Sequence, residues 1–251
     1  MISVCMATHN GERFIREQIV SILRQLGPMD EVVVSDDSST DGTTQVLRSL
    51  SDGRIRILHH QPRRITDNFE NALKSAKGDY IYLADQDDIW VDGRVAAVQA
   101  RLEAGVALVT VDAKMVDGDG RVIGESFFKV NGVRRGLVGN IAKNSFPGCC
   151  MAFRREVLDL ALPFPAYTYM HDWWIALVTI AHRLPYEFLN VPYHIYRRHG
   201  ENATGSGCRS RLPCWIRLYN RMTLVLPLVL RYWRNRFRFK GALSRCRGIM
   251  I

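Results

Sequence analysis

The chain has 251 residues, 47% of them hydrophobic and 10% aromatic, which excludes a disordered protein and allows a sizeable buried core. Its formal net charge of +9 would favour a nucleic-acid or membrane partner, but the charge is unevenly placed. Eleven of the 34 Lys and Arg residues follow residue 208, whereas no Asp or Glu follows Glu201. The basic character therefore belongs to a C-terminal tail, residues 209–251, and not to the domain before it.

Apolar runs and helical patterns alternate over the first 113 residues. Strands are expected at "ISVCMAT", "EVVVSDD", "RIRILHH", "DYIYLAD" and "VALVTVDA", because each is a short apolar run that ends in polar or turn residues. Helices are expected between them at 12–26, 43–50, 68–76 and 91–102. This alternation predicts an α/β fold with a Rossmann-like, mainly parallel central sheet and helices on both faces.

The regular alternation of strands and helices ends after residue 113. "DGDGR" at 117–121 indicates a hairpin turn, and "PGCCMAFRREVLDLAL" a turn and strand that lead into a helix. A further helix is expected over 172–183, followed by two short extended pieces near 186–198.

Six cysteines show no Cys-x-x-Cys spacing, which argues against a zinc ribbon or a redox motif. Cys5 lies in an apolar run and is expected to be a small core residue. Polar residues interrupt the first apolar run early, so we expect no secretory signal peptide and a reducing, cytoplasmic setting.

Polar clusters follow three of the first four predicted strands: "THNGE", "DDSSTDG" and "DQDD". Ligands of open parallel sheets bind outside the carboxyl ends of the strands, so we expect these clusters to converge. Magnesium and manganese prefer oxygen ligands and commonly bind one or two carboxylates plus substrate phosphates. Asp85 and Asp87, with one residue between them, could both reach one such ion.

Other common motifs fit poorly. In the calcium-binding pattern that begins at Asp37, the twelfth position should be Glu and is Arg48. The absence of a glycine-rich dinucleotide fingerprint and of a Walker A loop in the sequence weighs against NAD enzymes and P-loop NTPases.

Four stretches carry a family resemblance: "ISVCMATHNGERFIREQIVSIL", "VVVSDDSSTDGT", "NFENALKSAKGDYIYLADQDDIW" and "HDWW". In this order they resemble family 2 glycosyltransferases of the GT-A fold, in particular bacterial enzymes of O-antigen and capsule assembly, some of them rhamnosyltransferases. The resemblance implies inverting transfer of a sugar from a UDP- or dTDP-linked donor to a hydroxyl of a lipid-linked oligosaccharide. It also implies a nucleotide-sugar-binding half, 1–113, and an acceptor-binding half, 114–208.

The resemblance further assigns roles to single residues by position. Asp172 is the expected catalytic base, and Mg²⁺ or Mn²⁺ would be held at Asp85 and Asp87 with help from His199. Contacts to the donor are implied for Thr8, Glu12, Asp36, Asp37, Asn68 and Asp85. Contacts to the acceptor are implied for His171, Trp173 and Trp174.

Several of these residues keep a structural alternative. Asp172 and Asn68 could cap the starts of their helices, and Asp88 could cap the helix that follows it. His199 could be an exposed loop histidine and His171 a structural one. At least one residue of the pair Trp173–Trp174 could lie in the core. His9 stands where many family members have Tyr, so stacking on the nucleotide base is left open.

The tail has an uncharged core, Met222–Leu230, that Pro227 interrupts, whereas about 20 apolar residues are needed to cross a bilayer. Its aromatic residues alternate with Arg, which suits a basic amphipathic helix in an anionic membrane interface. We therefore expect a peripheral protein on the inner face of the cell membrane. A partner-binding helical hairpin is the alternative, and nucleic acid is disfavoured because the preceding domain is slightly acidic.

The leading hypothesis is thus a metal-dependent inverting glycosyltransferase. A nucleotidyltransferase of related fold is the second, although the glycine-rich loop with basic residues expected after the first strand is missing from the sequence. A non-catalytic module that binds nucleotide sugars is the third. The sequence selects no oligomeric state.

Overall fold

The computed structural model describes residues 1–61, 64–200 and 213–247. Its first half follows the predicted alternation of strands and helices, with three differences. The helix α3 begins three residues before its predicted start, α4 begins three residues after its predicted start, and the two-residue strand β5 was not predicted. The elements are β1 (Ile2–Thr8), α1 (Glu12–Leu23), β2 (Glu31–Asp37), α2 (Thr43–Ser49), β3 (Ile55–His60), α3 (Ile65–Ser75), β4 (Tyr80–Ala84), β5 (Ile89–Trp90) and α4 (Arg94–Glu103).

The second half adds strands on the far side of β4. Its elements are β6 (Leu108–Asp117), β7 (Val122–Gly124), α5 (Phe127–Asn131), α6 (Gly136–Ala142), the 3-10 turn η1 (Gly148–Cys150), β8 (Met151–Arg154), α7 (Arg155–Ala161), α8 (His171–Ala181) and β9 (Tyr186–Arg198). Within the described residues the sheet order is β3-β2-β1-β4-β8-β6-β9-β5, with β7 paired to β6.

The longer ladders of this sheet are parallel, and the antiparallel ones are short. β1 pairs in parallel with β2 and β4, as do β2 with β3 and β6 with β9. Only a few residues each of β4–β8, β6–β8, β6–β7 and β5–β9 pair antiparallel. The predicted mixed α/β fold with a mainly parallel sheet is confirmed.

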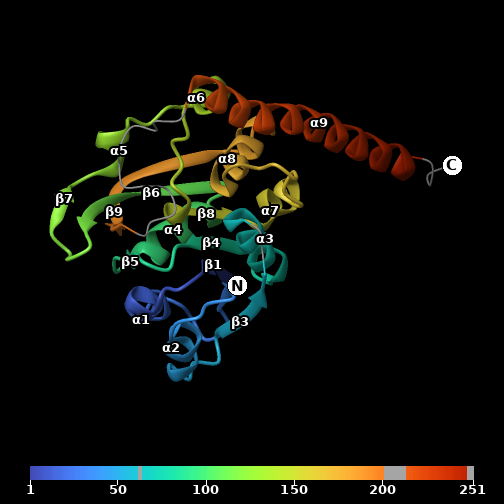
Figure 1. Cartoon of the computed structure of the whole chain (residues 1–251). Helices are drawn as coiled ribbons and strands as arrows, with labels where there is room; N and C mark the ends of the chain where they lie inside the picture. The colour runs from blue at the N-terminus through green and yellow to red at the C-terminus, as the bar shows by residue number, and fades with distance from the viewer. Residues whose placement is uncertain (62–63, 201–212, 248–251) are drawn as a thin grey trace.

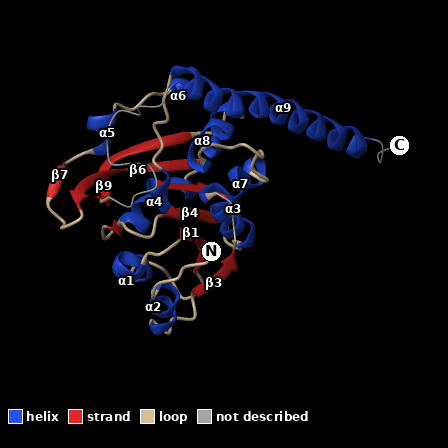
Figure 2. Ribbon diagram, viewed as in Figure 1, coloured by secondary structure: helices blue, strands red, loops and turns tan. Residues whose placement is uncertain are grey.

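Helices cover both faces of the sheet because the central strands are apolar on both sides (Figure 2). Successive side chains of a strand point to opposite faces, and all residues of β1 are buried. Val4 and Met6 pack with α1 and α4, whereas Cys5 and Ala7 pack in the core formed with α3, α7 and α8. Burial raises the pKa of the Cys5 thiol, as expected for a core cysteine.

Three details of the second half differ from or refine the sequence analysis. The hairpin turn forms as predicted, with Asp117 N donating to Arg121 O at 2.9 Å. The two predicted extended pieces near 186–198 are one strand, β9, which is irregular at its pairing with β6. The short helices α5 and α6 were not predicted, because five- and seven-residue helices carry too little periodicity to stand out.

The tail forms the long helix α9 (Cys214–Arg247), which runs along α6 and α8 and then extends beyond the body of the protein (Figure 1). Leu224 and Leu228 are 1% and 3% exposed and belong to the same hydrophobic core as α8. Within the described residues, none of the helices is long and apolar enough to cross a membrane.

Arg231 fastens α9 to the end of α7. Its guanidinium donates to the carbonyl oxygens of Leu160, Ala161, Leu162 and Pro163 at 2.5–3.1 Å, and it lies 5.5 Å from the centre of the Trp174 ring. The last carbonyls of a helix have no partner within the helix, so this buried cation satisfies groups that would otherwise be costly to bury.

Replacing Arg231 by Ala should lower the free energy of unfolding by about 2–3 kcal/mol, because four buried or partly buried carbonyls lose their donor at once. Urea denaturation followed by circular dichroism measures this change. Arg221→Ala is the matched control, since Arg221 donates one hydrogen bond, to Ala142 O at 2.7 Å in an exposed setting, and its removal should cost less than about 1 kcal/mol. Equal losses in the two variants would contradict the role given to Arg231.

Candidate functional site

The three polar loops predicted to converge at the carboxyl ends of β1, β2 and β4 are hydrogen-bonded to one another. Asn10 N donates to Ser39 Oγ at 2.9 Å, and Thr40 N donates to Asn10 Oδ1 at 2.9 Å. His9 and Gln86 exchange two bonds, His9 N to Gln86 Oε1 at 2.9 Å and Gln86 Nε2 to His9 O at 3.0 Å. The predicted convergence of these clusters is therefore confirmed.

Thr8, Asp36 and Asn68 meet beneath these loops. Thr8 Oγ1 donates to Asp36 Oδ1 at 3.1 Å, and Asn68 Nδ2 donates to Thr8 O at 3.3 Å. The buried Oδ1 of Asn68 has no hydrogen-bond partner among the described residues. Asn68 lies inside α3, three residues after its start, so the alternative that it caps this helix is wrong.

Glu12 and Asp37 hold the loop after β2 in place. Glu12 Oε2 accepts from Gly42 N at 2.9 Å, and the ring of His9 bonds to the backbone oxygen of Asp37 at 2.7 Å. These bonds fix the loop backbone. The donor contacts of Thr8, Glu12, Asp36, Asp37 and Asn68 stay predictions.

The turn after β4 places three carboxylates close together. Burial and the charges of Asp88 and Asp87 raise the pKa of Asp85 well above its ordinary value. Burial and the charge of Asp88 raise the pKa of Asp87 to about 6, against the opposing effect of His199. This cluster is electrostatically unfavourable when all its members are ionised.

The three predicted metal ligands, Asp85, Asp87 and His199, belong to two separate groups of side chains at this turn. Carboxylate oxygens of Asp85 and Asp88 lie within 4.8 Å of each other and of Cys149 Sγ. Asp87 Oδ2 instead lies 2.7 Å from His199 Nε2. Carboxylate oxygens with a nearby imidazole fit Mg²⁺ or Mn²⁺, and a cation would offset the repulsion among the acids.

His199 is packed against the domain. Its side chain is 10% exposed, and its ring centre lies 4.8 Å from that of Phe14 in α1. The alternative of an exposed loop histidine is therefore wrong.

Asp88 belongs to a buried chain of polar side chains. Arg94 donates to His194 Nδ1 at 2.5 Å. Because Arg can only donate, Nδ1 is the acceptor and the proton of the neutral imidazole is on Nε2. Nε2 donates this proton to Asp88 Oδ2 at 2.8 Å. Burial lowers the pKa of His194, which favours this neutral form. The other oxygen of Asp88 accepts from Arg197 N at 2.9 Å.

These hydrogen bonds give Asp88 a positioning role. Both of its oxygens hold β9 against the acidic turn, so they point to protein groups. The helix that follows begins after Gly93 and has no side-chain cap, so the predicted alternative that Asp88 caps it is wrong. Arg94 and His194 were not predicted as site residues, because they lie 100 residues apart in the chain and neither belongs to a local motif.

Asp172 lies in the first turn of α8, where Oδ2 accepts from Asn144 Nδ2 at 3.1 Å and Oδ1 accepts from Trp173 N at 2.6 Å. Burial raises the pKa of Asp172 to about 6, against these bonds and one from Gly148 N. The charge of Asp172 also raises the pKa of Asp85, so the two carboxylates lie within electrostatic reach of each other.

Gly148 connects Asp172 with the acidic turn. A Cβ atom at this position would lie 3.2 Å from Asp172 Cβ and from His171 Nε2, which is closer than most Cβ contacts, so a larger residue would require these side chains to shift. The next residue, Cys149, reaches Asp85. The segment 148–149 therefore bridges the two halves of the site.

The three predicted acceptor residues differ in position. His171 stacks on Phe69 with ring centres 3.8 Å apart, burial lowers its pKa to about 3, and its Nε2 has no partner among the described residues. Trp173 is nearly buried and donates to Asn140 O at 2.6 Å. Trp174 is 0% exposed and donates to Ala161 O, so it is a core residue and the predicted acceptor contact does not fit it.

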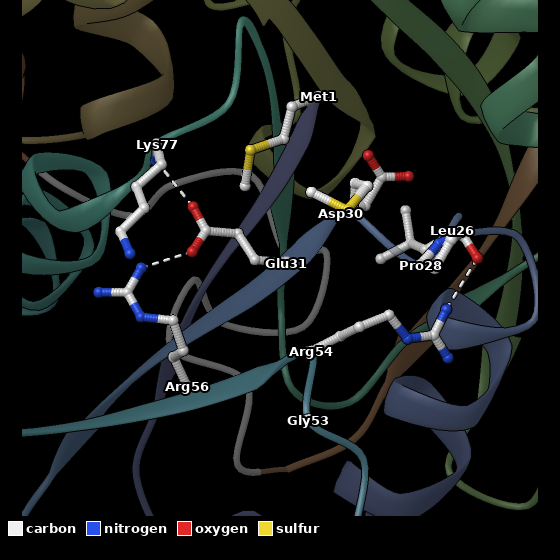
Figure 3. Close-up of a pocket in the computed structure, with 10 residues that line it drawn as sticks. Met1, Leu26, Pro28, Asp30, Glu31, Gly53, Arg54, Arg56 and Lys77 are labelled. Atoms are coloured by element: carbon white, nitrogen blue, oxygen red, sulfur yellow. Dashed lines mark hydrogen bonds and ion pairs between the residues drawn. The ribbon is translucent and has the colours of Figure 1, made fainter.

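A separate recess of about 560 Å³ lies at the opposite, amino-terminal edge of the sheet (Figure 3). Both arginines that line it are engaged: Arg54 pairs with Asp52 at 2.7 Å, and Arg56 pairs with Glu31. We therefore interpret this recess as a structural joint between β2 and β3.

The acidic turn at the carboxyl edge of the sheet and the buried carboxylate on α8 are the features that the family resemblance predicted. A comparison of the sequence with models of known families gives the same family. The sequence model described as "Glycosyl transferase family 2" matches residues 3–160. The chain belongs to glycosyl transferase family 2. The predicted family and enzyme class are thereby confirmed.

Individual members and solved structures extend this comparison. The chain is 25% identical over 179 residues to UDP-Glc:alpha-D-GlcNAc-diphosphoundecaprenol beta-1,3-glucosyltransferase WfgD of Escherichia coli, covering 70% of this chain and 68% of WfgD. It resembles Staphylococcus aureus TarS 1–349 in complex with UDP-GlcNAc, with a TM-score of 0.65, 22% identity, and coverage of 83% of this chain and 62% of TarS. It also resembles the mannosyltransferase PcManGT from Pyrobaculum calidifontis in complex with GDP-Man and Mn²⁺, with a TM-score of 0.59, 22% identity, and coverage of 94% and 64%. The chain thus spans just under two thirds of each of these solved chains.

Replacing His194 by Ala should cost about 3 kcal/mol of unfolding free energy, because it leaves Asp88 and Arg94 buried without their shared partner. Denaturant unfolding measures the loss. His59→Ala serves as the control, since His59 is exposed on β3 and should change stability by less than about 0.5 kcal/mol. A His194→Ala protein as stable as wild type would contradict the buried chain.

Proposed function

We propose that this family member transfers a sugar, with inversion, from a nucleoside-diphosphate sugar to a hydroxyl of a lipid-linked oligosaccharide in the synthesis of a cell-surface polysaccharide such as O-antigen or capsule. The observation that carries the proposal is the buried carboxylate of Asp172 within electrostatic reach of the acidic turn. One site therefore combines a group that can accept a proton with a group of acids that suits a cation and a diphosphate.

Asp172 is the proposed catalytic base. With a pKa of about 6 it is ionised at neutral pH, yet basic enough to take the proton of an attacking hydroxyl. Asn144 and Gly148 N orient the carboxylate. Burial lowers the pKa of His171 to about 3, so it stays neutral beside Asp172. His171 and Trp173 are the proposed acceptor residues.

Asp85 and Asp87 are the proposed ligands of a divalent cation, Mg²⁺ or Mn²⁺, with His199 beside them. Such an ion would act as a Lewis acid for the charge that develops on the leaving diphosphate. Asp88 acts through Arg197 and His194 to keep β9, and with it His199, against the turn.

The donor is proposed to be UDP- or dTDP-linked and to contact Thr8, Glu12, Asp36, Asp37, Asn68 and Asp85. Support comes from WfgD, whose name specifies a UDP-Glc donor and a diphosphoundecaprenol-linked acceptor, and from TarS, which was solved with UDP-GlcNAc. The Mn²⁺ in the PcManGT structure supports the proposed cation. We also propose the division into a nucleotide-sugar half, 1–113, and an acceptor half, 114–208.

The proposed location is the inner face of the cell membrane, with residues 209–251 as the associating segment. A lipid-linked acceptor would be reached there. Of this segment, residues 209–212 and 248–251 lie outside the described residues.

Asp172→Asn should lower kcat by about 10²–10⁴ with little change in the KM for the donor, because the amide keeps the shape but cannot accept the proton. In the wild type, the pKa of Asp172 lies near 6, so the base is ionised above and protonated below that value. Transfer should therefore fall about tenfold per pH unit below pH 6. Transfer assays with purified protein across pH 5 to 8 measure both effects.

Asp159→Asn is the control for this experiment, since Asp159 is an exposed acid on α7, and it should transfer at the wild-type rate. Wild-type transfer by Asp172→Asn would refute the assignment of the base. Absence of transfer by the wild type with every donor would instead favour the non-catalytic binding module.

Saturating nucleotide sugar with Mn²⁺ should raise the melting temperature by about 5–10 °C, since ligand at 100 times Kd adds about 2.7 kcal/mol and each kcal/mol shifts a domain of this size by about 2–4 °C. The Asp85→Asn and Asp87→Asn variants should lose the metal-dependent part of this shift. Asp92→Asn, an exposed acid a few residues later, should keep it. An equal shift in the presence of EDTA would overturn the metal site.

A further inference from the structure

Over the described side chains between Trp215 and Trp233, α9 has two apolar faces, of which one packs on the domain. Leu224 and Leu228 face the core, and Arg231 on the same side bonds to the end of α7. The opposite side carries exposed apolar residues that are 47–70% exposed: Trp215, Leu218, Tyr219, Met222, Leu226, Val229, Leu230 and Trp233. We call these eight residues the outer stripe.

Helical geometry makes the outer stripe one continuous surface. Eighteen residues separate Trp215 from Trp233, which is five turns at 100° per residue, so both lie on one line along the helix. Leu224 lies nine residues from each, which is two and a half turns, and therefore on the opposite side. At 1.5 Å per residue the stripe is about 27 Å long and lies along the helix surface.

Large exposed apolar surfaces of this kind mark sites of interaction. The two occupants that fit a long amphipathic helix are another helix and a lipid surface. The charge of α9 decides between them. Its sequence carries nine Lys and Arg residues and no Asp or Glu. Arg231 is buried against α7, and six of the other basic residues follow Trp233.

This charge opposes pairing of two copies through the stripe, because two such helices would bring together only positive charges. An anionic lipid surface has the complementary charge, and each basic residue near it is worth on the order of 1 kcal/mol. The tryptophans near the two ends of the stripe also suit the headgroup level of a bilayer.

We propose that the outer stripe of α9 inserts into the headgroup and acyl boundary of an anionic membrane, with the helix lying in the plane of that membrane. This inference rests on the membrane location proposed above and names the surface and the lipid chemistry responsible. α9 packs on α8, whose first turn holds Asp172 (Figure 1). Docking therefore fixes the orientation of the proposed base relative to the membrane surface.

The test is sedimentation of the full chain with vesicles, without donor or acceptor, so that its outcome does not depend on sugar transfer. The wild type should bind vesicles of phosphatidylglycerol and phosphatidylcholine, and should bind pure phosphatidylcholine vesicles at least about tenfold more weakly. The double variant Leu226→Gln/Leu230→Gln should bind the anionic vesicles at least about tenfold more weakly, because it removes apolar surface from the stripe without changing the charge.

Met29→Gln/Ile123→Gln is the matched control, since these side chains are 77% and 51% exposed on other parts of the surface. It should bind as the wild type does. All four substituted residues are exposed, so both variants should keep the wild-type melting temperature.

Tryptophan fluorescence in vesicles with brominated lipids gives a second readout. Emission of the wild type should be quenched, whereas Trp215→Phe/Trp233→Phe should resist quenching, since Trp90, Trp173 and Trp174 are buried. Equal binding by the Leu226→Gln/Leu230→Gln variant, or an oligomer of the wild type that this variant converts to a monomer without any vesicle binding, would overturn the proposal. The second result would identify another copy of the chain as the occupant.

Discussion

The repulsion among Asp85, Asp87 and Asp88 is the constraint on which the site depends. Three carboxylates within four positions are stable together only if each finds a different partner. Asp88 is held by a neutral histidine and a backbone N–H, and Asp87 by His199. Asp85 lies beside a thiol and the other acids, and its pKa is raised well above its ordinary value. A bound cation would therefore stabilise the ionised form of Asp85 more than that of Asp87 or Asp88.

The partners of these acids explain the topology of the second half. His194, Arg197 and His199 all come from β9 or its end, and β9 reaches the turn because it pairs with both β6 and β5. The Gly148–Cys149 segment approaches from the other side and brings Asp172 to the same edge of the sheet. The parallel half of the sheet supplies the acids, and the mixed half supplies the groups that hold them.

The sequence was sufficient for features that depend on local pattern. Apolar runs predicted the strands, and the rule that ligands bind at the carboxyl ends of parallel strands predicted which loops would meet. Long-range polar contacts were beyond its reach. Nothing near Arg94 or His194 indicates that they bond to each other, and the capping roles considered for Asn68 and Asp88 were wrong because both residues bond to distant strands.

In the tail, too, the sequence predicted the helix but not its long-range packing. The mixture of apolar and basic residues predicted an amphipathic helix, but an inner face of Leu224, Leu228 and Arg231 and an outer stripe cannot be told apart by composition. Only the packing on α8 separates them. Because Leu224, Leu228 and Arg231 pack on the domain, the outer stripe lies on the opposite side of the helix from α8, whose first turn holds Asp172.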